Sequence, residues 1–372
     1  MKFSIHAKDF KKLVSSVSRS INPKPSLPSL QGIYFLADKE KLTLVGSDLD
    51  IVTKAKTPLE AEVEGQCLVN GRVASEVIRK LPFGNVVVSD VGKELKIEPG
   101  SAVFNLRKLD EESYPKELIV EKEFKEEETV LNKEELFEAI NQVSVASAQE
   151  GSKPILTGVL FDKGGEEESV NLVSTDSYRL ASKELTGKSL KEIGVVSKKA
   201  LVEVVRLFEE TEEDVKVFTE EREVHFYNTS YQVSLRKIEG EFPNYKNLFP
   251  KETVFSVEVN KETILEALDR SAVVAEGYIP IQISFSDKTL KITSSNQDIG
   301  GGKEEVGCVF LGVDVKEVEN FEMSFNPTYL MEAIGVLVGE KVYLRFSGNQ
   351  KPLLVQGETD SYKHLLMPVR PS

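Results

Sequence analysis

The sequence is poor in the residues that most often take part in metal and redox chemistry. Among 372 residues there are two cysteines and three histidines. Cys67 and Cys308 are far apart and match no metal or redox spacing, so we expect two buried thiols in a reducing cytosol. His6, His225 and His364 are scattered, without a cysteine or carboxylate partner at a recognisable spacing, and we expect them to be strand residues. Neither a metal site nor a cofactor is predicted.

Apolar runs of membrane-spanning length are also missing. Residues 1–6 lead directly into a strand-then-helix pattern, so we expect no signal peptide, no membrane attachment and a cytoplasmic location. The run Gly300 to Gly302 is followed neither by Gly-Lys-Ser/Thr nor by a helix start, which predicts a flexible turn rather than a phosphate-binding loop. No catalytic constellation is recognisable, and we do not expect an enzyme.

Basic residues are outnumbered by acidic ones, 47 to 61, and the formal net charge is −14. This balance argues against a protein that holds nucleic acid by bulk electrostatics. It leaves open a protein that concentrates its basic residues on one surface. With 40% apolar residues a chain of this length can bury real cores, and it suits two or three domains.

Amphipathic helices with similar sequences recur along the chain. The segment 132–140 returns as 260–268, and a looser relative occupies residues 8–17. Asn132 and Asn260 can cap the first two of these, and an apolar stripe at helical spacing follows in each copy. Short amphipathic helices are often alike by chance, so the segments that follow them decide whether this is a repeat.

Those following segments also recur. Each copy continues with strands and then a second helix, whose predicted caps are Asn70, Ser197 and Asn326. The caps are spaced by 127 residues (70 to 197) and 129 residues (197 to 326). Solenoid repeats are only roughly 20–50 residues long, so each copy is predicted to be a domain. The fold class is therefore α+β, with three repeated domains of two helices on an antiparallel sheet.

The domain boundaries follow from this period and from one charged segment. Residues 118–128 read as a charged linker with nothing to bury. We place the three domains at residues 1–123, 124–251 and 252–372.

Three motifs appear in order along this triplicated chain: residues 175–181 (TDSYRLA), 242–245 (FPNY) and 367–370 (MPVR). With these motifs, its length and its order of elements, the whole chain resembles the bacterial sliding clamps, the beta subunits of DNA polymerase III. The resemblance implies a head-to-tail homodimer that forms a closed six-domain ring around duplex DNA, with helices lining the hole and sheets outside. It also implies a processivity factor, associated with the replisome on the nucleoid, that binds DNA without sequence preference. Its other partners would be the replicative polymerase, a clamp loader and further clamp-binding-motif proteins.

The same resemblance implies a groove that captures a short linear motif from partner proteins. Aliphatic and methionine walls suit varied apolar side chains, and we expect Tyr178 and Arg179 to be amphipathic anchors. The alternative for residues 175–180 is an ordinary strand with a polar tip. The implied groove consists of Leu156, Thr175, Ser177, Tyr178, Arg179, Leu180, Pro243, Asn247, Leu248, Met367, Pro368, Val369 and Arg370.

Basic residues on the second helices of the first two repeats are candidates for contact with DNA. The third copy of this helix, residues 326–338, contains no lysine or arginine. A closed ring stays on DNA by topology, so weak contacts between its lining residues and the phosphates are compatible with sliding. The alternative for any one residue is a solvated helix face. The candidates are Lys24, in a loop that matches a DNA-contacting loop of the family, with Arg72, Arg79, Lys80, Lys198, Lys199 and Arg206.

Four residues match the subunit contact of the family: Phe104 and Leu106 in the first repeat, and Val273 and Val274 in the third. Their alternative is ordinary domain core. Two other functions stay open from the sequence. One is a repeat scaffold that binds proteins without DNA, and the other is an enzyme with a cleft between domains.

Overall fold

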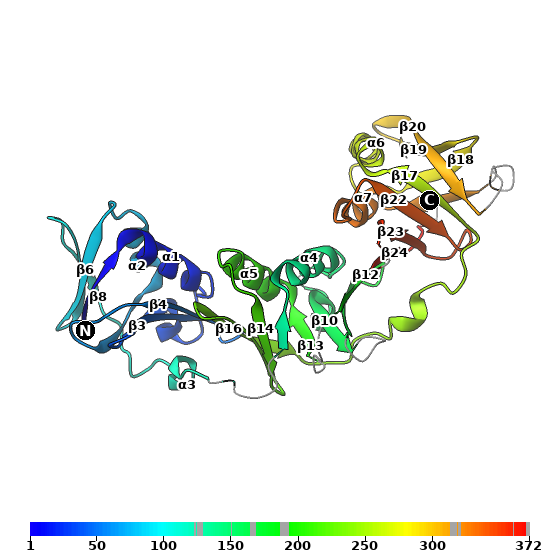
Figure 1. Cartoon of the computed structure of the whole chain (residues 1–372). Coiled ribbons are helices and arrows are strands. Elements are labelled where there is room, and N and C mark those ends of the chain that lie inside the picture. The colour runs from blue at the N-terminus through cyan, green and yellow to red at the C-terminus, as the bar shows by residue number, and fades with distance from the viewer. Residues whose placement is uncertain are drawn as a thin grey trace. The chain divides into compact units, whose positions relative to one another are not determined.

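A computed structural model describes residues 1–122, 124, 129–149, 151–163, 169–186, 193–312, 318, 321–359 and 361–369 (Figure 1). The chain forms two compact units. The first contains Met1–Lys133 with Lys199–Lys237, and the second contains Glu134–Lys198 with Ile238–Ser372. Within the described ranges, no helix is both long and apolar enough to span a membrane.

The first unit contains two antiparallel sheets. The smaller has the strand order β1 (Lys2–His6), β6 (Asn85–Val91), β7 (Glu94–Pro99), β8 (Phe104–Arg107). The larger has the order β5 (Gly65–Asn70), β2 (Gly32–Ala37), β3 (Lys41–Ser47), β4 (Ile51–Pro58), β16 (Tyr231–Ile238), β15 (Glu223–Tyr227), β14 (Val215–Thr219), β9 (Thr129–Leu131). The β4–β16 pairing joins strands of the first and second repeats in one ladder.

Two helices of the first repeat pack on these sheets. They are α1 (Ala7–Ser18) and α2 (Gly71–Arg79), which contact each other and lie on the same side of the larger sheet (Figure 1). The predicted stripe of α1 is buried, and Phe10 makes edge contacts with Phe3 and Phe35 at centroid distances of 6.4 and 6.2 Å. The side chain of Asn70 accepts from the Val73 amide at 3.1 Å, which confirms the predicted cap.

The second unit is built in the same way. Its larger antiparallel sheet has the order β13 (Gly194–Ser197), β10 (Gly158–Lys163), β11 (Ser169–Thr175), β12 (Arg179–Thr186), β24 (Tyr362–Leu366), β23 (Leu353–Gln356), β22 (Lys341–Phe346), β17 (Phe255–Asn260), β20 (Gly300–Leu311). The long strand β20 also borders the other sheet, β21 (Glu322–Phe325), β18 (Ile281–Ser286), β19 (Thr289–Asn296), β20. The β12–β24 pairing joins the second and third repeats.

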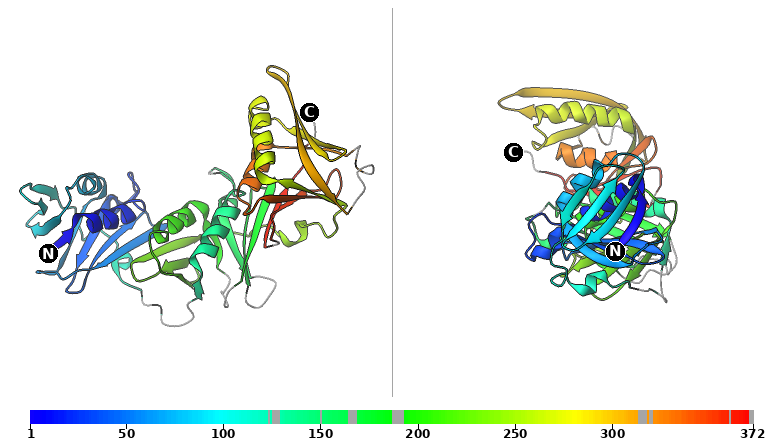
Figure 2. Two further views of the ribbon diagram at one scale, coloured as in Figure 1. Left: turned by 45° about the horizontal axis from the view of Figure 1, so that its top comes forward. Right: turned by 90° about the vertical axis from the view of Figure 1, so that its left-hand side faces the viewer.

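The remaining helices complete two per repeat. They are α4 (Lys133–Ser144) and α5 (Lys198–Phe208) from the second repeat, with α6 (Lys261–Val274) and α7 (Pro327–Gly335) from the third, besides a short α3 (Lys116–Ile119). Asn260 and Asn326 cap α6 and α7, and Pro327 opens α7, as predicted. Helix α6 contacts β20 along its length, as Figure 2 shows. The α+β class with three repeats of two helices and antiparallel strands is confirmed.

Two local predictions were wrong. Residues 300–302 are not a turn but the start of β20, where they pair with residues 294–296 of β19. Small residues are tolerated there because the strand is a sheet border. The predicted linker 118–128 begins with two half-buried side chains, Leu118 and Ile119, which pack on a core cluster that includes Tyr34 and Tyr114. Residues 123 and 125–128 of this linker lie outside the described residues. Both predicted buried thiols, Cys67 and Cys308, are buried and free.

Candidate functional site

The turn between β11 and β12 is fixed by its own side chains. Thr175 Oγ1 accepts from the Ser177 amide at 3.2 Å and donates to the Arg179 carbonyl at 2.7 Å. Asp176 Oδ1 accepts from the Tyr178 and Arg179 amides at 2.9 and 3.0 Å. Ser177 has a φ of 80°, a left-handed conformation that costs energy for a residue with a Cβ. This rigid turn holds Tyr178 outward, with 66% of its surface exposed.

The first repeat contains the same turn between β3 and β4. Ser47 Oγ accepts from the Leu49 amide at 3.0 Å, and Leu49 has the same φ of 80°. Asp48 Oδ1 accepts from the amides of Asp50 and Ile51 at 3.1 and 2.8 Å. The turn is therefore a property of the repeat rather than of one site. What differs is its tip, where Tyr178 and Arg179 stand in place of Asp50 and Ile51.

The end of the chain passes beside Tyr178. Strand β24 pairs with β12, and the Met367 amide extends this ladder by donating to the Tyr178 carbonyl at 2.9 Å. The Val369 amide then donates to the Ser324 carbonyl at 2.8 Å. Met367 and Val369 are 43% and 39% exposed, and the surface at Tyr178 continues to Met367, its main-chain partner. Arg370 lies outside the described residues.

A hydrophobic cluster supports this surface from below. Leu180 and Leu365 belong to it, from the paired strands β12 and β24, together with Leu160, Val173, Val195, Tyr245 and Leu354. Leu156 is also buried, in the short 3-10 helix Pro154–Thr157 that precedes β10. Thr175, Leu156 and Leu180 are all buried, and of these Leu180 belongs to the cluster.

The 242–248 segment packs on the same cluster. Phe242 and Phe249 contact it, and Tyr245 is one of its members. The Tyr245 hydroxyl donates to Asp162 at 2.8 Å, and Lys246 pairs with the same carboxylate at 2.9 Å. Burial opposes ionisation of Asp162, but these two donors outweigh it and lower the pKa of its carboxyl. Anchored in this way, the segment exposes Pro243, Asn247 and Leu248, the last with 51% of its surface exposed.

Arg179, which was predicted to be an amphipathic anchor of the groove, points into the protein. It is 8% exposed. Its Nε donates to Asp176 Oδ2 at 3.0 Å, its Nη1 donates to Glu332 of α7, and its guanidinium carbon lies 4.0 Å from the ring centroid of Tyr329. The sequence motif could not show this inward course, because the partners Tyr329 and Glu332 come from another repeat.

Basic side chains border a groove of about 950 Å³ on α1 and α2. Of the predicted DNA-contacting residues, Lys24, Arg72 and Arg79 line it, and Lys80 is exposed next to Arg79. Arg72 is paired with Glu76 at 3.7 Å, one helical turn away. The sequence reasoning missed two further lysines of this groove, Lys11 and Lys12 on α1. Their position on the polar face of the opening helix was the available signal.

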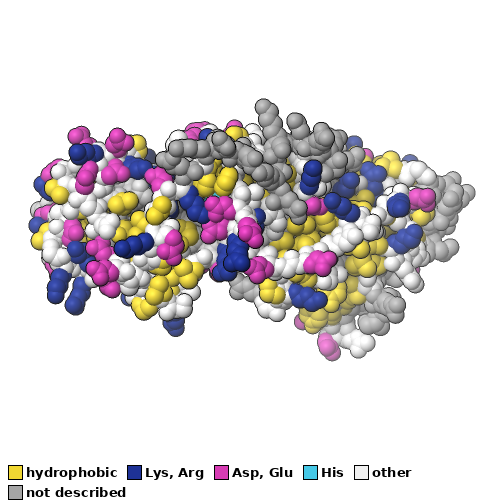
Figure 3. All heavy atoms as spheres, turned by 90° about the horizontal axis from the view of Figure 1, so that it is seen from below, with side chains coloured by type: hydrophobic (Ala, Val, Ile, Leu, Met, Phe, Trp, Pro, Cys, Tyr) yellow, Lys and Arg dark blue, Asp and Glu magenta, His cyan; other side chains and the backbone are white. Residues whose placement is uncertain are grey.

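The second-repeat candidates differ from one another. Lys199 and Arg206 are exposed on α5, and Arg206 pairs with Glu203 at 2.8 Å. Lys198 is half-buried, and burial lowers the pKa of its ammonium, with Glu332 opposing this shift and Arg179 adding to it. Among the described residues on the face seen in Figure 3, cationic and acidic side chains are interspersed. Mixed charge of this kind does not favour bulk electrostatic binding on that face.

The four predicted subunit-contact residues lie on two separate borders. Phe104, 40% exposed, and Leu106, 7% exposed, are on β8, which within the described chain pairs only with β7. Val273, 74% exposed, and the half-buried Val274 end α6. Val273 and Phe104 are exposed, whereas Leu106 is core.

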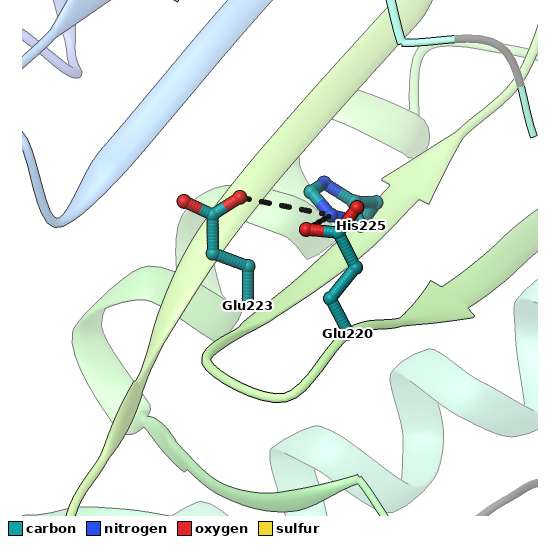
Figure 4. A group of neighbouring side chains, drawn as sticks. All are labelled: Glu220, Glu223 and His225. Carbon is teal, nitrogen blue, oxygen red and sulfur yellow. Dashed lines mark ion pairs between the residues drawn. The ribbon is translucent and has the colours of Figure 1, made fainter.

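The three histidines lie in β1, β15 and β24, as predicted. One of them, His225, has carboxylate neighbours that no recognisable sequence spacing indicated. Nε2 of His225 lies 3.5 Å from Glu220 and 3.7 Å from Glu223, at the end of the β14–β15 hairpin (Figure 4). Burial, followed by the nearby Lys122, lowers the pKa of His225 to about 4, against the effect of the two carboxylates. The hairpin register, which the sequence pattern did not reveal, brings these side chains together.

Comparison with known proteins covers the whole chain. Family models match in order the N-terminal domain (residues 1–118), central domain (130–244) and C-terminal domain (246–370) of the DNA polymerase III beta subunit. The beta sliding clamps of Streptomyces coelicolor and Staphylococcus aureus are each 28% identical to the chain, over 385 and 388 residues, covering 100% of it and 99% of each relative.

Solved structures of sliding clamps are also similar to this chain over its whole length. The DNA polymerase sliding clamp of Bacillus subtilis is similar with a TM-score of 0.90 and 26% identity, over 100% of this chain and 99% of that one. The DNA polymerase III beta subunit of Pseudomonas aeruginosa, bound to griselimycin, has a TM-score of 0.91 at 24% identity, with coverage of 100% and 99%, and shares the fold.

Proposed function

Because the chain belongs to the DNA polymerase III beta subunit family, the beta sliding clamps, we propose that it acts as a ring that keeps a polymerase on its template. A sliding clamp is a processivity factor and not an enzyme. It encircles duplex DNA without sequence preference and tethers the replicative polymerase and other replication and repair proteins. Tethering acts through effective concentration, because a weakly bound polymerase held beside the template rebinds before it diffuses away. The observation that supports this best is the ordered match of all three domains along the chain.

The three clamp domains of this ring are residues 1–123, 124–251 and 252–372. The two gaps between the family matches, at 119–129 and at 245, support boundaries near these positions. The segment around Glu121 and Lys122 connects the first domain to the second. Its charged side chains pair with Lys41, Lys56, Glu220 and Glu223, so it is a docked connection.

Ring closure joins the first domain of one subunit to the third domain of its partner. Two unlike borders support a head-to-tail contact: β8, with its exposed Phe104, and the 300–307 part of β20, which in the described chain pairs on one side only, with β19. Unpaired strand borders are ready sites for pairing with another chain. The exposed Val273 at the end of α6 adds apolar surface to the second border. When two copies of the chain each join their first border to the second border of the other copy, the two contacts close a ring.

DNA passes along the helix side of the domains, past Lys24, Arg72, Arg79 and Lys80 on the first domain and Lys198, Lys199 and Arg206 on the second. Lys11 and Lys12 extend the first group. Internal ion pairs such as Arg72–Glu76 weaken the attraction of this lining for phosphate. Each tight phosphate contact adds about 0.9 to the salt slope of binding, so a few weak contacts suit a ring that must slide.

Partner proteins bind the surface formed by Tyr178, Leu248, Met367 and Val369, which we call the capture surface. Its exposed aromatic, methionine and aliphatic side chains can contact apolar anchors of a short peptide. Pro243, Asn247, Ser177 and Pro368 border it, and Arg370 completes the predicted set. Thr175, Arg179, Leu180 and Leu156 hold it in place. A separate ATP-driven loader opens the ring, and the protein acts in the cytoplasm on the nucleoid.

Retention on circular DNA tests this proposal. The clamp is loaded on nicked circular plasmid by a cognate loader, and bound protein is measured at high salt before and after linearisation. We expect retention on the circle and loss from the linear form. Equal loss from both, with loading confirmed independently by crosslinking, would instead favour a scaffold that does not encircle DNA.

A further inference from the structure

We propose that Glu220, Glu223 and His225 form a binding site for a divalent transition-metal ion, best suited to Zn²⁺, in which the metal replaces the ammonium group of Lys122. The site lies at the end of the β14–β15 hairpin in the first unit, and it shares no residue with the capture surface or with the groove on α1 and α2. It is independent of the proposed clamp function.

The spacing of the three side chains fits a small tetrahedral cation. One ligand atom from each lies within 4.8 Å of the other two. The His225 Nε2 atom is 3.5 Å from Glu220 Oε2 and 3.7 Å from Glu223 Oε2. A tetrahedral Zn²⁺ with bonds of about 2.0–2.1 Å separates its ligand atoms by about 3.3–3.5 Å. Figure 4 shows both carboxylates turned toward the imidazole. Only small side-chain shifts are needed to bind such an ion.

His225 is prepared as a ligand. It is fully buried, and its Nε2 atom has no hydrogen-bond partner among the described residues. Its other nitrogen, Nδ1, lies 2.8 Å from Ser234 Oγ. A proton on Nδ1 donated to that hydroxyl leaves a lone pair on Nε2 directed at the carboxylates. Metal-bound histidines are usually held by such a second hydrogen bond, which fixes the tautomer and the ring.

Aromatic rings hold the imidazole further. Phe124 packs on it at a centroid distance of 4.9 Å, and Phe218 lies at 6.1 Å. These rings limit rotation of His225 and exclude water from one side. The exposed side of Glu220 leaves room for a water molecule as fourth ligand.

Lys122 shows that the site already favours a cation. Its Nζ lies 2.8 Å from both Glu220 Oε2 and Glu223 Oε2. The two carboxylates have a formal charge of −2, and one ammonium leaves −1 uncompensated. A divalent ion neutralises the pair and adds a bond to Nε2 of His225, an atom to which Lys122 makes no hydrogen bond. Replacement of Lys122 is therefore an exchange of one cation for another.

The ligand set selects among metals. Mg²⁺ and Ca²⁺ take oxygen ligands in larger coordination shells, whereas one imidazole with two carboxylates suits Zn²⁺ and its neighbours in the first transition row. We therefore expect Zn²⁺ and Co²⁺ to bind and Mg²⁺ to compete poorly. Since the described residues supply three ligands, the site differs from a closed structural centre of the four-ligand kind.

Titration of the full-length protein with ZnCl₂ and CoCl₂, after treatment with a chelator, tests the site. We expect one Zn²⁺ per chain, and a Co²⁺ complex whose visible absorption indicates low coordination number and a nitrogen ligand. Glu223→Gln should weaken binding by at least about 10-fold. Lys122→Met should tighten it by about 10-fold, because the competing ammonium is gone. Glu221→Gln, an exposed carboxylate in the same turn, is the matched control and should leave affinity unchanged.

Three outcomes would overturn the proposal. One is no binding by the wild-type protein. Another is equal affinity in the wild type and Glu223→Gln, which would place the ion elsewhere. The third is weaker binding in Lys122→Met, which would make the lysine a support rather than a competitor. Circular dichroism of each variant checks that the fold is retained. His225 itself is not replaced, because it is buried and its replacement would change the stability of the fold as well as the metal affinity.

Discussion

The guanidinium of Arg179 lies 4.0 Å from the ring centroid of Tyr329, and this contact connects the turn that presents Tyr178 to helix α7 of the next repeat. The same group donates to Asp176 and to Glu332. Arg179 therefore supports the capture surface from beneath.

Replacing Arg179 with methionine should lower the free energy of unfolding by about 3 kcal/mol, because the carboxylate of Asp176 would be left nearly buried without its cation. Urea unfolding followed by circular dichroism measures this; the chain has no tryptophan for fluorescence. The matched variant is Arg206→Met, which removes an exposed arginine paired within its own helix and should change stability by less than about 0.5 kcal/mol. Similar losses in both variants would contradict the role given to Arg179.

Tyr178→Ala should reduce affinity for a clamp-binding peptide by about 1–3 kcal/mol while stability stays nearly unchanged, because the ring is largely exposed. Isothermal titration calorimetry with one such peptide provides the measurement. Tyr278→Ala removes an equally exposed tyrosine, 67% against 66%, from the third repeat. If both variants bind the peptide alike, Tyr178 does not belong to the capture surface.

The double change Val273→Glu and Val274→Glu should produce monomers, since two carboxylates at the proposed subunit border would be desolvated without partners. Sedimentation velocity of the wild type and the variant distinguishes the species. Val338→Glu, at a valine that is 62% exposed on another surface, is the control that should remain dimeric. A dimer that persists in the double variant would move the interface away from the end of α6.

Stability should fall with acid partly through His364. Burial lowers the pKa of this fully buried imidazole to about 3, whereas the unfolded value is about 6.5. The unfolded chain therefore takes up the proton first, so the contribution is intact above about pH 6.5 and is lost as the pH falls toward 3, by about 1.4 kcal/mol per unit.

Urea unfolding at pH 7 and pH 5 should thus show a loss for the wild type about 2 kcal/mol larger than for His364→Asn. Asparagine keeps a polar group near the Tyr362 hydroxyl, which lies 2.9 Å from Nδ1 of the histidine. Carboxylates elsewhere titrate in both proteins and cancel in the comparison. Parallel losses would mean that His364 is not kept neutral by the fold.

The sequence was sufficient for features set by local periodicity. Caps such as Asn70 and Asn326 recur at a fixed interval, and the apolar stripes face the cores as helical spacing predicts. Features that depend on strand register could not be predicted from the sequence. The partners of Arg179 come from a distant helix, and Glu220, Glu223 and His225 meet only because a hairpin aligns them. The segment after Leu118 looked like a solvated linker because its few apolar residues are separated by charges.

The joints between repeats differ in kind from the joint between subunits. Within one chain, the first repeat is bonded to the second by residues 51–55 against 231–235, and the second to the third by residues 179–183 against 362–366. Both are main-chain ladders, whose hydrogen bonds break together rather than one at a time. A loader that pulls on such a ring will find these seams mechanically stiff. The proposed joint between subunits has no covalent chain connection across it, so we expect the loader to open the ring there rather than at the seams between repeats.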